Sequence, residues 1–146
     1  MFKKLDLVIY MPQTINNFKV DRTYDFDFGN VSFYSNFLIT ELNEGVCFNI
    51  EDALKIAELV TIHFKNRPFG YISNRVNSYS LIPVNYLKIK EVFPSIEAFA
   101  AVTYSEIQKS VLKVENSFLN GMLSDFDNLS DAVTWVQSKL DKEGDS

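Results

Sequence analysis

The sequence predicts an α/β fold, a single mixed β-sheet in which an N-terminal antiparallel meander is followed by the order αβαβαβα, with about four helices. Apolar and polar residues alternate in the first third of the chain, which is the period of strands with one buried face. From residue 49 onward, stretches with helical spacing alternate with short apolar runs. Parallel strands need helical crossovers of this length, so the alternation indicates one sheet that carries helices.

The meander is expected to contain three strands. Between residues 24 and 28, aromatic residues alternate with aspartates. Gly29 and Asn30 are typical of a tight turn into the second strand. Ser35 and Asn36 form a second polar pair before the third apolar run.

The first two helices follow from capping and proline signals. Asn49 can cap a first helix that ends before Pro68, and the short apolar run 69–73 then reads as a buried parallel strand. Pro83 suits the first turn of a helix, so a second helix is expected from there to about residue 93.

Capping residues and apolar spacing also predict the last two helices. Residues 96–103 are a buried-strand candidate, and Ser105 with Gln108 resembles a capping box that opens a third helix. Its expected inward residues are Ile107, Val111, Val114 and Phe118. After an edge-like run at 122–126, a fourth helix opens at Asn128. Its expected inward stripe is Leu129, Ala132, Val133, Val136 and Leu140, with Trp135 on the flank.

Length and charge restrict the function. The 146 residues suit one domain at 18–140, with residues 1–17 as an appendage or extra edge strand and residues 141–146 as a charged, frayed tail. The net charge of −5 argues against nucleic-acid binding. The apolar stretch near the N-terminus is too short to span a bilayer. A single cysteine, Cys47, suits a reducing cytoplasm and is expected to be a small buried residue.

The chain resembles a known superfamily in its whole-domain pattern. The segments that carry the resemblance are YDFDFG, NEGVCFNIEDA, PFGYISNRVNSYSLIP, AFAAVTY and FDNLSDAVTWV. Together with the element order, they resemble the STAS superfamily in its SpoIIAA-like branch, which is often described together with Sec14-type lipid-binding domains. The resemblance implies a small cytoplasmic bacterial regulator that is not an enzyme. It also implies phosphorylation by a partner kinase after a central strand, where Ser78 and Ser80 are the candidates.

The loop between the central strand and the second helix is the candidate site for a ligand or partner. Its residues are Asn74, Arg75, Asn77, Ser78, Tyr79 and Ser80. A helix N-terminus with a nearby arginine could bind a small anion or a lipid headgroup. Alternatively, these side chains satisfy turn and cap hydrogen bonds while Arg75 pairs with a carboxylate.

No catalytic or metal-binding constellation is expected elsewhere, and no cofactor. His63 falls within a helix and has no evident nucleophile partner, so it is interpreted as structural. The acidic positions suit the solvated face of the meander better than a metal site; they are Asp21, Asp25, Asp27, Glu41 and Glu44.

The sequence therefore predicts a non-enzymatic regulatory or protein-interaction module, switched at the loop before the second helix. The alternative is a small-molecule or lipid-binding domain of Sec14-like character. In that case an acyl chain would lie among aromatic residues, with Arg75 near the mouth; these residues are Phe33, Phe37, Phe48, Phe64 and Phe99. Dense packing of these rings is the expectation for a native interior.

Overall fold

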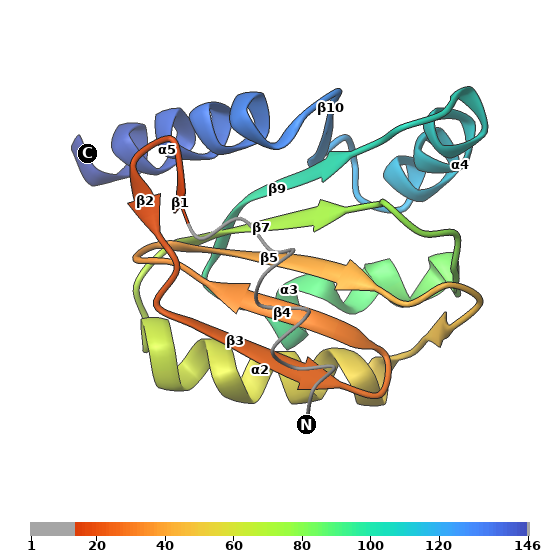
Figure 1. The fold of residues 1–146 in the computed structure, drawn as a ribbon, viewed down its shortest axis with the longest axis horizontal. Coiled ribbons are helices and arrows are strands. Elements are labelled where there is room, and N and C mark those ends of the chain that lie inside the picture. Colours follow the sequence, from red (N-terminus) through yellow and green to blue (C-terminus); the bar gives the residue numbers. More distant parts are fainter. Residues whose placement is uncertain (1–13, 146) are drawn as a thin grey trace.

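A six-stranded mixed sheet forms the centre of the molecule in the computed structural model, which describes residues 14–145 (Figure 1). The strands are β3 (Arg22–Phe26), β4 (Gly29–Phe33), β5 (Phe37–Leu42), β7 (Phe69–Asn74), β9 (Ile96–Val102) and β10 (Leu123–Phe126). Their order across the sheet is β10-β9-β7-β5-β4-β3. The first three strands along the chain pair antiparallel and the others parallel, which confirms the predicted meander and its αβ continuation.

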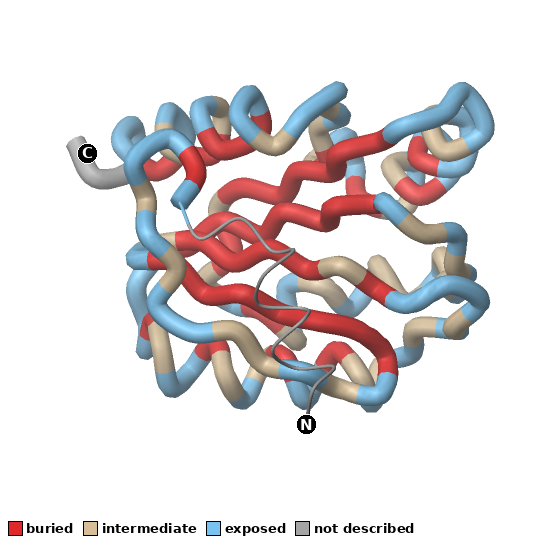
Figure 2. The backbone as a smooth tube through the Cα atoms, viewed as in Figure 1, coloured by how far each residue is buried: buried red, intermediate tan, exposed pale blue. Residues whose placement is uncertain are grey.

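Helices cover both faces of this sheet. They are α2 (Ile50–Phe64), the 3-10 helix η1 (Pro83–Lys88), α3 (Ile89–Val92), α4 (Glu106–Ser117) and α5 (Leu129–Asp145). One core cluster joins α2, α3 and α4 to one face, and a second joins α5 to the other. The buried strands between them stand out in Figure 2. The predicted second helix thus begins at Pro83 as expected, but its first six residues are 3-10 helix.

Capping side chains fix where the long helices begin. Asn49 and Asp52 form a reciprocal capping box at the start of α2. Asn128 Oδ1 accepts a hydrogen bond from the Asp131 backbone N–H at the start of α5. The stripe predicted for α5 is confirmed, because Val133 and Val136 are fully buried. The helix α5 continues to Asp145, so it includes most of the segment that was expected to be a charged tail.

Two glycines permit close approaches in the sheet. Gly29 has a φ of 143°, and a Cβ there would overlap the carbonyl oxygen of Glu41 on β5. It is the first residue of β4, so the tight turn is Asp27-Phe28 rather than the predicted Gly29-Asn30. A Cβ at Gly70 would overlap Val136 of α5, so this glycine lets α5 lie close against β7.

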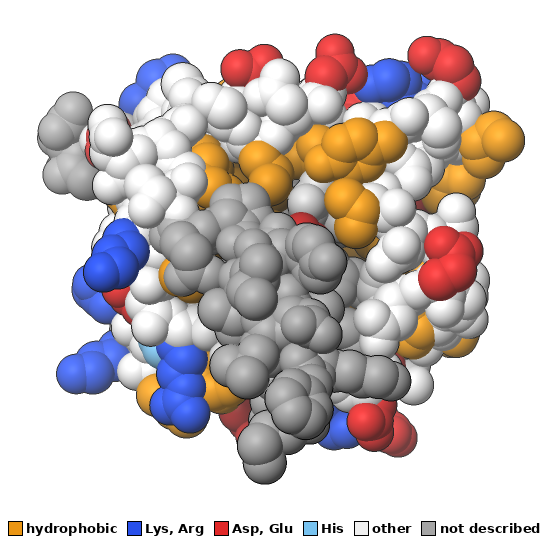
Figure 3. Space-filling model, viewed as in Figure 1, with side chains coloured by type: hydrophobic (Ala, Val, Ile, Leu, Met, Phe, Trp, Pro, Cys, Tyr) orange, Lys and Arg blue, Asp and Glu red, His pale blue; other side chains and the backbone are white. Residues whose placement is uncertain are grey.

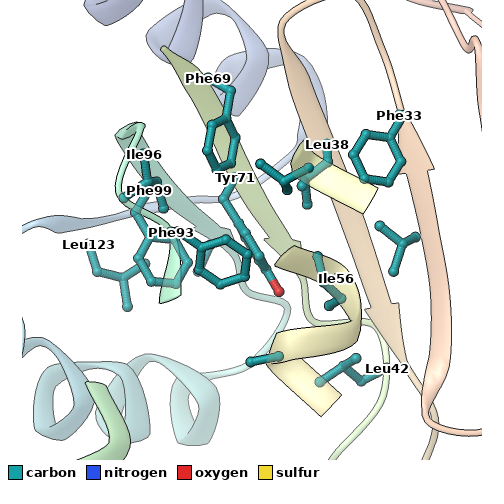
Figure 4. Packing of buried hydrophobic residues seen from close by; sticks show 14 of the residues in the cluster. Phe33, Leu38, Leu42, Ile56, Phe69, Tyr71, Phe93, Ile96, Phe99 and Leu123 are labelled. Atoms are coloured by element: carbon teal, nitrogen blue, oxygen red, sulfur yellow. The ribbon is translucent and has the colours of Figure 1, made fainter. Parts of the chain in front are cut away.

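Aromatic rings fill the core on the α2 side. Figure 4 shows Phe93 and Phe99 on the same side of Tyr71 of β7, and both rings contact it edge-on, at centroid separations of 5.6 and 5.2 Å. Phe64 stacks on Phe69 at 5.2 Å. Most of the interior is therefore closely packed, as expected for a native core.

Two small sheets complete the described residues. Strands β1 (Thr14–Ile15) and β2 (Phe18–Lys19) form a hairpin that contacts α5, and Asn16 donates a hydrogen bond to the Ser130 carbonyl. The two strands of this hairpin form a separate sheet and do not belong to the six-stranded sheet. Of residues 1–17, which were expected to be an appendage or an extra edge strand, residues 1–13 lie outside the described part of the chain. Strands β6 (Cys47–Phe48) and β8 (Ser80–Leu81) pair parallel and hold the loop after β7 in place.

Candidate functional site

A buried ion pair lies at the centre of the candidate site. Arg75 Nη1 and Nη2 donate to the two carboxylate oxygens of Glu115 at 2.6 and 2.8 Å. The two side chains are only 7% and 2% exposed. Tyr86 donates a third hydrogen bond to Glu115 at 2.5 Å, and Arg75 Nε donates to Ser73 Oγ. The alternative in which Arg75 pairs with a carboxylate is therefore what the structure shows.

This environment keeps Arg75 charged. Burial alone lowers the pKa of Arg75, but the hydrogen bond to Glu115 and the charge of that carboxylate outweigh it, so the pKa is raised overall. An external anion would have to compete with a bidentate carboxylate that is already in place. Arg75 therefore anchors the loop to α4 rather than presenting a free cation.

Asn74 is also buried, on the opposite face of the sheet. Its Nδ2 donates to Glu41 Oε2 at 2.8 Å, and its Oδ1 accepts from the Tyr104 hydroxyl at 2.6 Å. Burial raises the pKa of Glu41, and the hydrogen bond from Asn74 partly offsets this effect. Asn74 thus links β5, β7 and the start of α4 through satisfied hydrogen bonds.

Hydrogen bonds attach the remaining loop residues to the segment at the end of β5. Two serines of the loop stay exposed. Asn77 Nδ2 donates to the Leu42 carbonyl, and the Ser78 backbone N–H donates to Glu44 Oε1 at 2.9 Å. Tyr79 is half-buried, and its hydroxyl is hydrogen-bonded to Ser73 Oγ. Ser78 and Ser80 are exposed. The six predicted site residues thus divide into buried anchors and an accessible rim.

The predicted orientation of α4 is wrong. Its buried residues are Leu112 and Glu115, whereas the expected inward residues Ile107, Val111 and Val114 are exposed, Ile107 by 77%. Figure 3 shows hydrophobic side chains at the surface where α4 lies in Figure 1.

Polar contacts account for this orientation. Gln108 Oε1 accepts from the Tyr104 backbone N–H, and Gln108 Nε2 donates to the Arg75 carbonyl at 2.7 Å. Together with the ion pair between Glu115 and Arg75, these hydrogen bonds orient α4 so that Gln108 and Glu115 face the sheet. Sequence reasoning missed Gln108, Glu115 and Tyr86 as site residues. The available signal was the spacing of Gln108, Leu112 and Glu115, which share one helix face.

The exposed stripe of α4 and the loop after β7 form a groove of about 460 Å³, here called the α4 groove. Ile107, Val111 and Val114 form the α4 side. Ser78, Ser80 and Pro83 are among the residues on the other side. The structure thus brings the predicted serines next to an apolar helix face.

A second, smaller pocket lies between the sheet and the α2–α3 layer. Its volume is about 70 Å³, which holds only a few water molecules. Of the five aromatic residues considered for an acyl-chain site, Phe48 and Phe99 line it, while Phe33, Phe37 and Phe64 are packed against other rings. The space is too small for an acyl chain.

His63 and Cys47 lie near opposite ends of α2. His63 is on α2, where its ring stacks on Phe33 at 4.2 Å and its Nε2 is hydrogen-bonded to the Tyr24 hydroxyl at 2.7 Å. Cys47 is exposed in β6, so the expectation of a buried cysteine is wrong. Among residues 14–145, no group of three or more His, Cys, Asp or Glu side chains is arranged to hold a metal ion.

His63 is expected to make stability depend on pH. Burial lowers the pKa of His63 below its ordinary 6.5, so the unfolded chain takes up a proton at higher pH than the folded chain. Its contribution to stability is therefore present above pH 6.5 and lost as pH falls through the folded-state pKa. We expect the wild-type melting temperature to fall more than that of His63→Gln between pH 7 and 5.5. Parallel slopes for the two proteins would contradict this assignment.

The fold connects the chain to a solved structure. No family model matches the sequence, and no curated protein matches it. The crystal structure of an uncharacterized protein of the DUF3478 family from Shewanella loihica PV-4, described as having a SpoIIAA-like fold, aligns with a TM-score of 0.50. The alignment covers 82% of this chain and 91% of that one. The chain has a SpoIIAA-like fold. At 16% identity, the likeness extends to the fold alone.

The SpoIIAA-like fold agrees with the resemblance seen in the sequence. In this chain it combines the antiparallel meander with three parallel strands and their helical crossovers. No helix in the described part of the chain is long and apolar enough to cross a bilayer.

Proposed function

We propose that this SpoIIAA-like protein is a non-enzymatic regulatory module of the bacterial cytoplasm that binds a partner protein in the α4 groove. The observation that carries the proposal is that Ile107, Val111 and Val114 form an exposed apolar stripe on α4. The opposite face of this helix, which carries Glu115, is turned inward. Soluble proteins rarely leave adjoining apolar side chains on the surface unless they serve an interaction. The STAS resemblance supports the same class of function.

The groove suits a partner that inserts apolar side chains. Its α4 wall is held rigidly, because Gln108 and Glu115 are both hydrogen-bonded to Arg75. A surface that is already ordered loses little conformational entropy on binding. Outside the groove lining, the loop and the segment after it expose further apolar residues, which are Val76, Ile82, Val84 and Leu87.

Phosphorylation at the rim would switch this docking. Ser78 and Ser80 line the groove and are exposed to a kinase. Glu44 lies beside Ser78, since its carboxylate accepts a hydrogen bond from the Ser78 backbone N–H. A phosphate on Ser78 would therefore meet a like charge and add strong hydration beside an apolar groove. Both effects oppose the docking of an apolar partner.

Site-specific crosslinking in the host cell tests the proposal. A photoreactive phenylalanine analogue placed at Val111 is expected to capture one defined protein, because that side chain faces the groove. The matched control carries the same analogue at Ile62, which is 66% exposed on α2 and remote from the groove. Mass spectrometry then identifies the captured chain, and the purified pair is mixed to confirm binding.

The proposal requires that capture be specific to the groove. Adding Ile107→Glu should abolish crosslinking from Val111 while leaving the melting temperature unchanged, since surface changes shift stability by only about 0.5 kcal/mol. The same products from Val111 and Ile62, or no product from Val111, would overturn the proposal.

A further inference from the structure

The loop after β7 is bonded to the segment of β6 through alternate backbone groups. The Gly45 N–H donates to the Ser78 carbonyl at 2.7 Å, and the Ser80 N–H donates to the Val46 carbonyl at 2.9 Å. Strand β8 continues this ladder as the partner of β6 in a parallel sheet of two strands. In a strand, the backbone groups of successive residues point to opposite sides. The bonds toward β6 therefore use Ser78 and Ser80 and not the residues that follow them.

The backbone N–H and C=O groups of Tyr79 and Leu81 point away from β6 for the same reason. In the part of the chain that the structure describes, no strand pairs with β8 on that side. Tyr79 and Leu81 both line the α4 groove, whereas no residue of β6 does. The free edge of β8 thus lies along the groove, and each of these two residues offers it one hydrogen-bond donor and one acceptor.

A free strand edge favours an extended partner over a helical one. An edge with unpaired backbone groups is a template for pairing with another chain. Strands β6 and β8 have only two residues each, and a ladder of two strands is marginally stable by itself. A third strand would extend this ladder. A partner helix would leave the edge of β8 unpaired, because the backbone groups of a helix bond to one another.

The α4 wall of the groove runs alongside the loop. Gln108, near the start of α4, donates to the Arg75 carbonyl at 2.7 Å, and Glu115, near its end, accepts from Tyr86 of η1. The groove therefore has the backbone edge of β8 on one side and the exposed apolar stripe of α4 on the other. An extended segment fits this combination, because its main chain bonds to the strand edge while alternate side chains contact apolar surface.

The charge at one end of the groove favours a basic residue in the bound segment. Glu44 accepts a hydrogen bond from the Ser78 backbone N–H, and Glu106 lies in the first turn of α4; both carboxylates are exposed. Arg75 lines the groove, but Glu115 compensates its charge. The fixed charge where the loop begins is therefore negative, and a complementary charge would set the register of the segment.

We propose that the partner docks through an extended segment that adds a strand to the free edge of β8. The segment packs apolar side chains on the α4 stripe and places a lysine or arginine near Glu44 and Glu106. This inference rests on the proposed function and specifies the kind of segment that binds. In the complex, β8 becomes the middle strand of a three-stranded sheet.

Backbone methylation of the bound segment tests strand addition. Tandem mass spectrometry of the product crosslinked at Val111 locates the contacted residue of the partner, and a synthetic peptide of about ten residues around it is the probe. Two further peptides carry N-methyl groups on its odd-numbered or on its even-numbered residues. In an added strand only one of these sets points to β8. One methylated peptide should therefore bind the full chain at least about tenfold more weakly, and the other should bind like the parent peptide.

Amide hydrogen exchange of the full chain supplies a second measurement. With the parent peptide bound, the N–H groups of Tyr79 and Leu81 should exchange at least about tenfold more slowly. The N–H of Ser80 is already bonded to Val46 and should change little.

Three results would refute strand addition: equal binding of the two methylated peptides, equal weakening of both, or unchanged exchange at Tyr79 and Leu81. Equal weakening with unchanged exchange would identify a helical segment. A parent peptide that fails to bind would also refute this inference. In each case the capture from Val111 still supports docking in the groove, so the two proposals fail separately.

Charge reversal tests the predicted basic residue of the segment. Glu106→Lys should raise the Kd of the parent peptide about threefold at low salt, the effect of an exposed ion pair, and less at high salt. Glu51→Lys is the matched control, because Glu51 is exposed in the first turn of α2 and does not line the groove. This control should leave Kd unchanged. Equal Kd values for the two variants would contradict the charge complementarity.

Discussion

Replacing Glu115 by alanine is expected to reduce the free energy of unfolding by about 3–5 kcal/mol. The change leaves the Arg75 guanidinium buried with neither of its two carboxylate contacts. Arginine cannot release its proton in a protein, so the charge cannot be relieved by titration. Tyr86 also loses its acceptor on Glu115. Urea denaturation of the variant and the wild type measures the loss.

Two further variants show whether the loss of stability comes from the buried, unpaired charge of Arg75. Lys113→Ala changes an exposed charge on the same helix and should alter the free energy of unfolding by no more than about 0.5 kcal/mol. The double variant Arg75→Met with Glu115→Leu removes both charges and should recover much of the stability. A Glu115→Ala protein as stable as Lys113→Ala would show that the ion pair is not buried as described.

Val133→Asp is expected to unfold the protein or to lower its stability by several kcal/mol. Val133 is fully buried in the cluster that joins α5 to the sheet. An unpaired carboxylate there would be desolvated or forced to take up a proton, at a cost comparable with the roughly 5–15 kcal/mol that stabilises a whole domain. Thermal melts followed by circular dichroism measure the effect.

Ser138→Asp is the matched control on the same helix. Ser138 is exposed, so an added carboxylate there remains hydrated and should change stability only slightly. Equal melting temperatures for Val133→Asp and the wild type would mean that α5 does not pack on the sheet through this face.

Local signals in the sequence predicted most of the fold because they act over a few residues. Asn49 and Asn128 cap the helices at the predicted positions, and the apolar stripe of α5 packs on the sheet as expected. Pro83 marks the right starting point, but the short segment after it forms a 3-10 turn before α3. Proline fixes one φ angle, and it does not determine which helical hydrogen-bond pattern follows.

The orientation of α4 could not be predicted in the same way. Periodicity identifies an apolar stripe but does not say whether that stripe faces the protein or a partner. Here the opposite face is turned inward by Arg75, which is 40 residues from Glu115 along the chain. The sequence raised the possibility that Arg75 pairs with a carboxylate, but it did not identify Glu115. Such pairings depend on tertiary distances that local spacing does not encode.

The sequence therefore predicted where the candidate site lies, but not which of its residues are buried. The loop after β7 does lie beside a groove, yet Asn74 and Arg75 support that loop from within. The exposed position of Cys47 was missed because β6 is a two-residue strand outside the main sheet. The accessible features of the site are Ser78, Ser80 and the stripe of α4.

The affinity of the crosslinked partner for single-residue variants tests the docking surface most directly. Isothermal titration would compare the wild type with Ile107→Glu in the groove and with Ile62→Glu on α2, two exposed isoleucines with the same substitution. We expect Ile107→Glu to raise Kd at least about tenfold, because a buried interface position tolerates an unpaired charge poorly. Ile62→Glu should leave Kd unchanged. Equal affinities for all three proteins would contradict docking in the α4 groove.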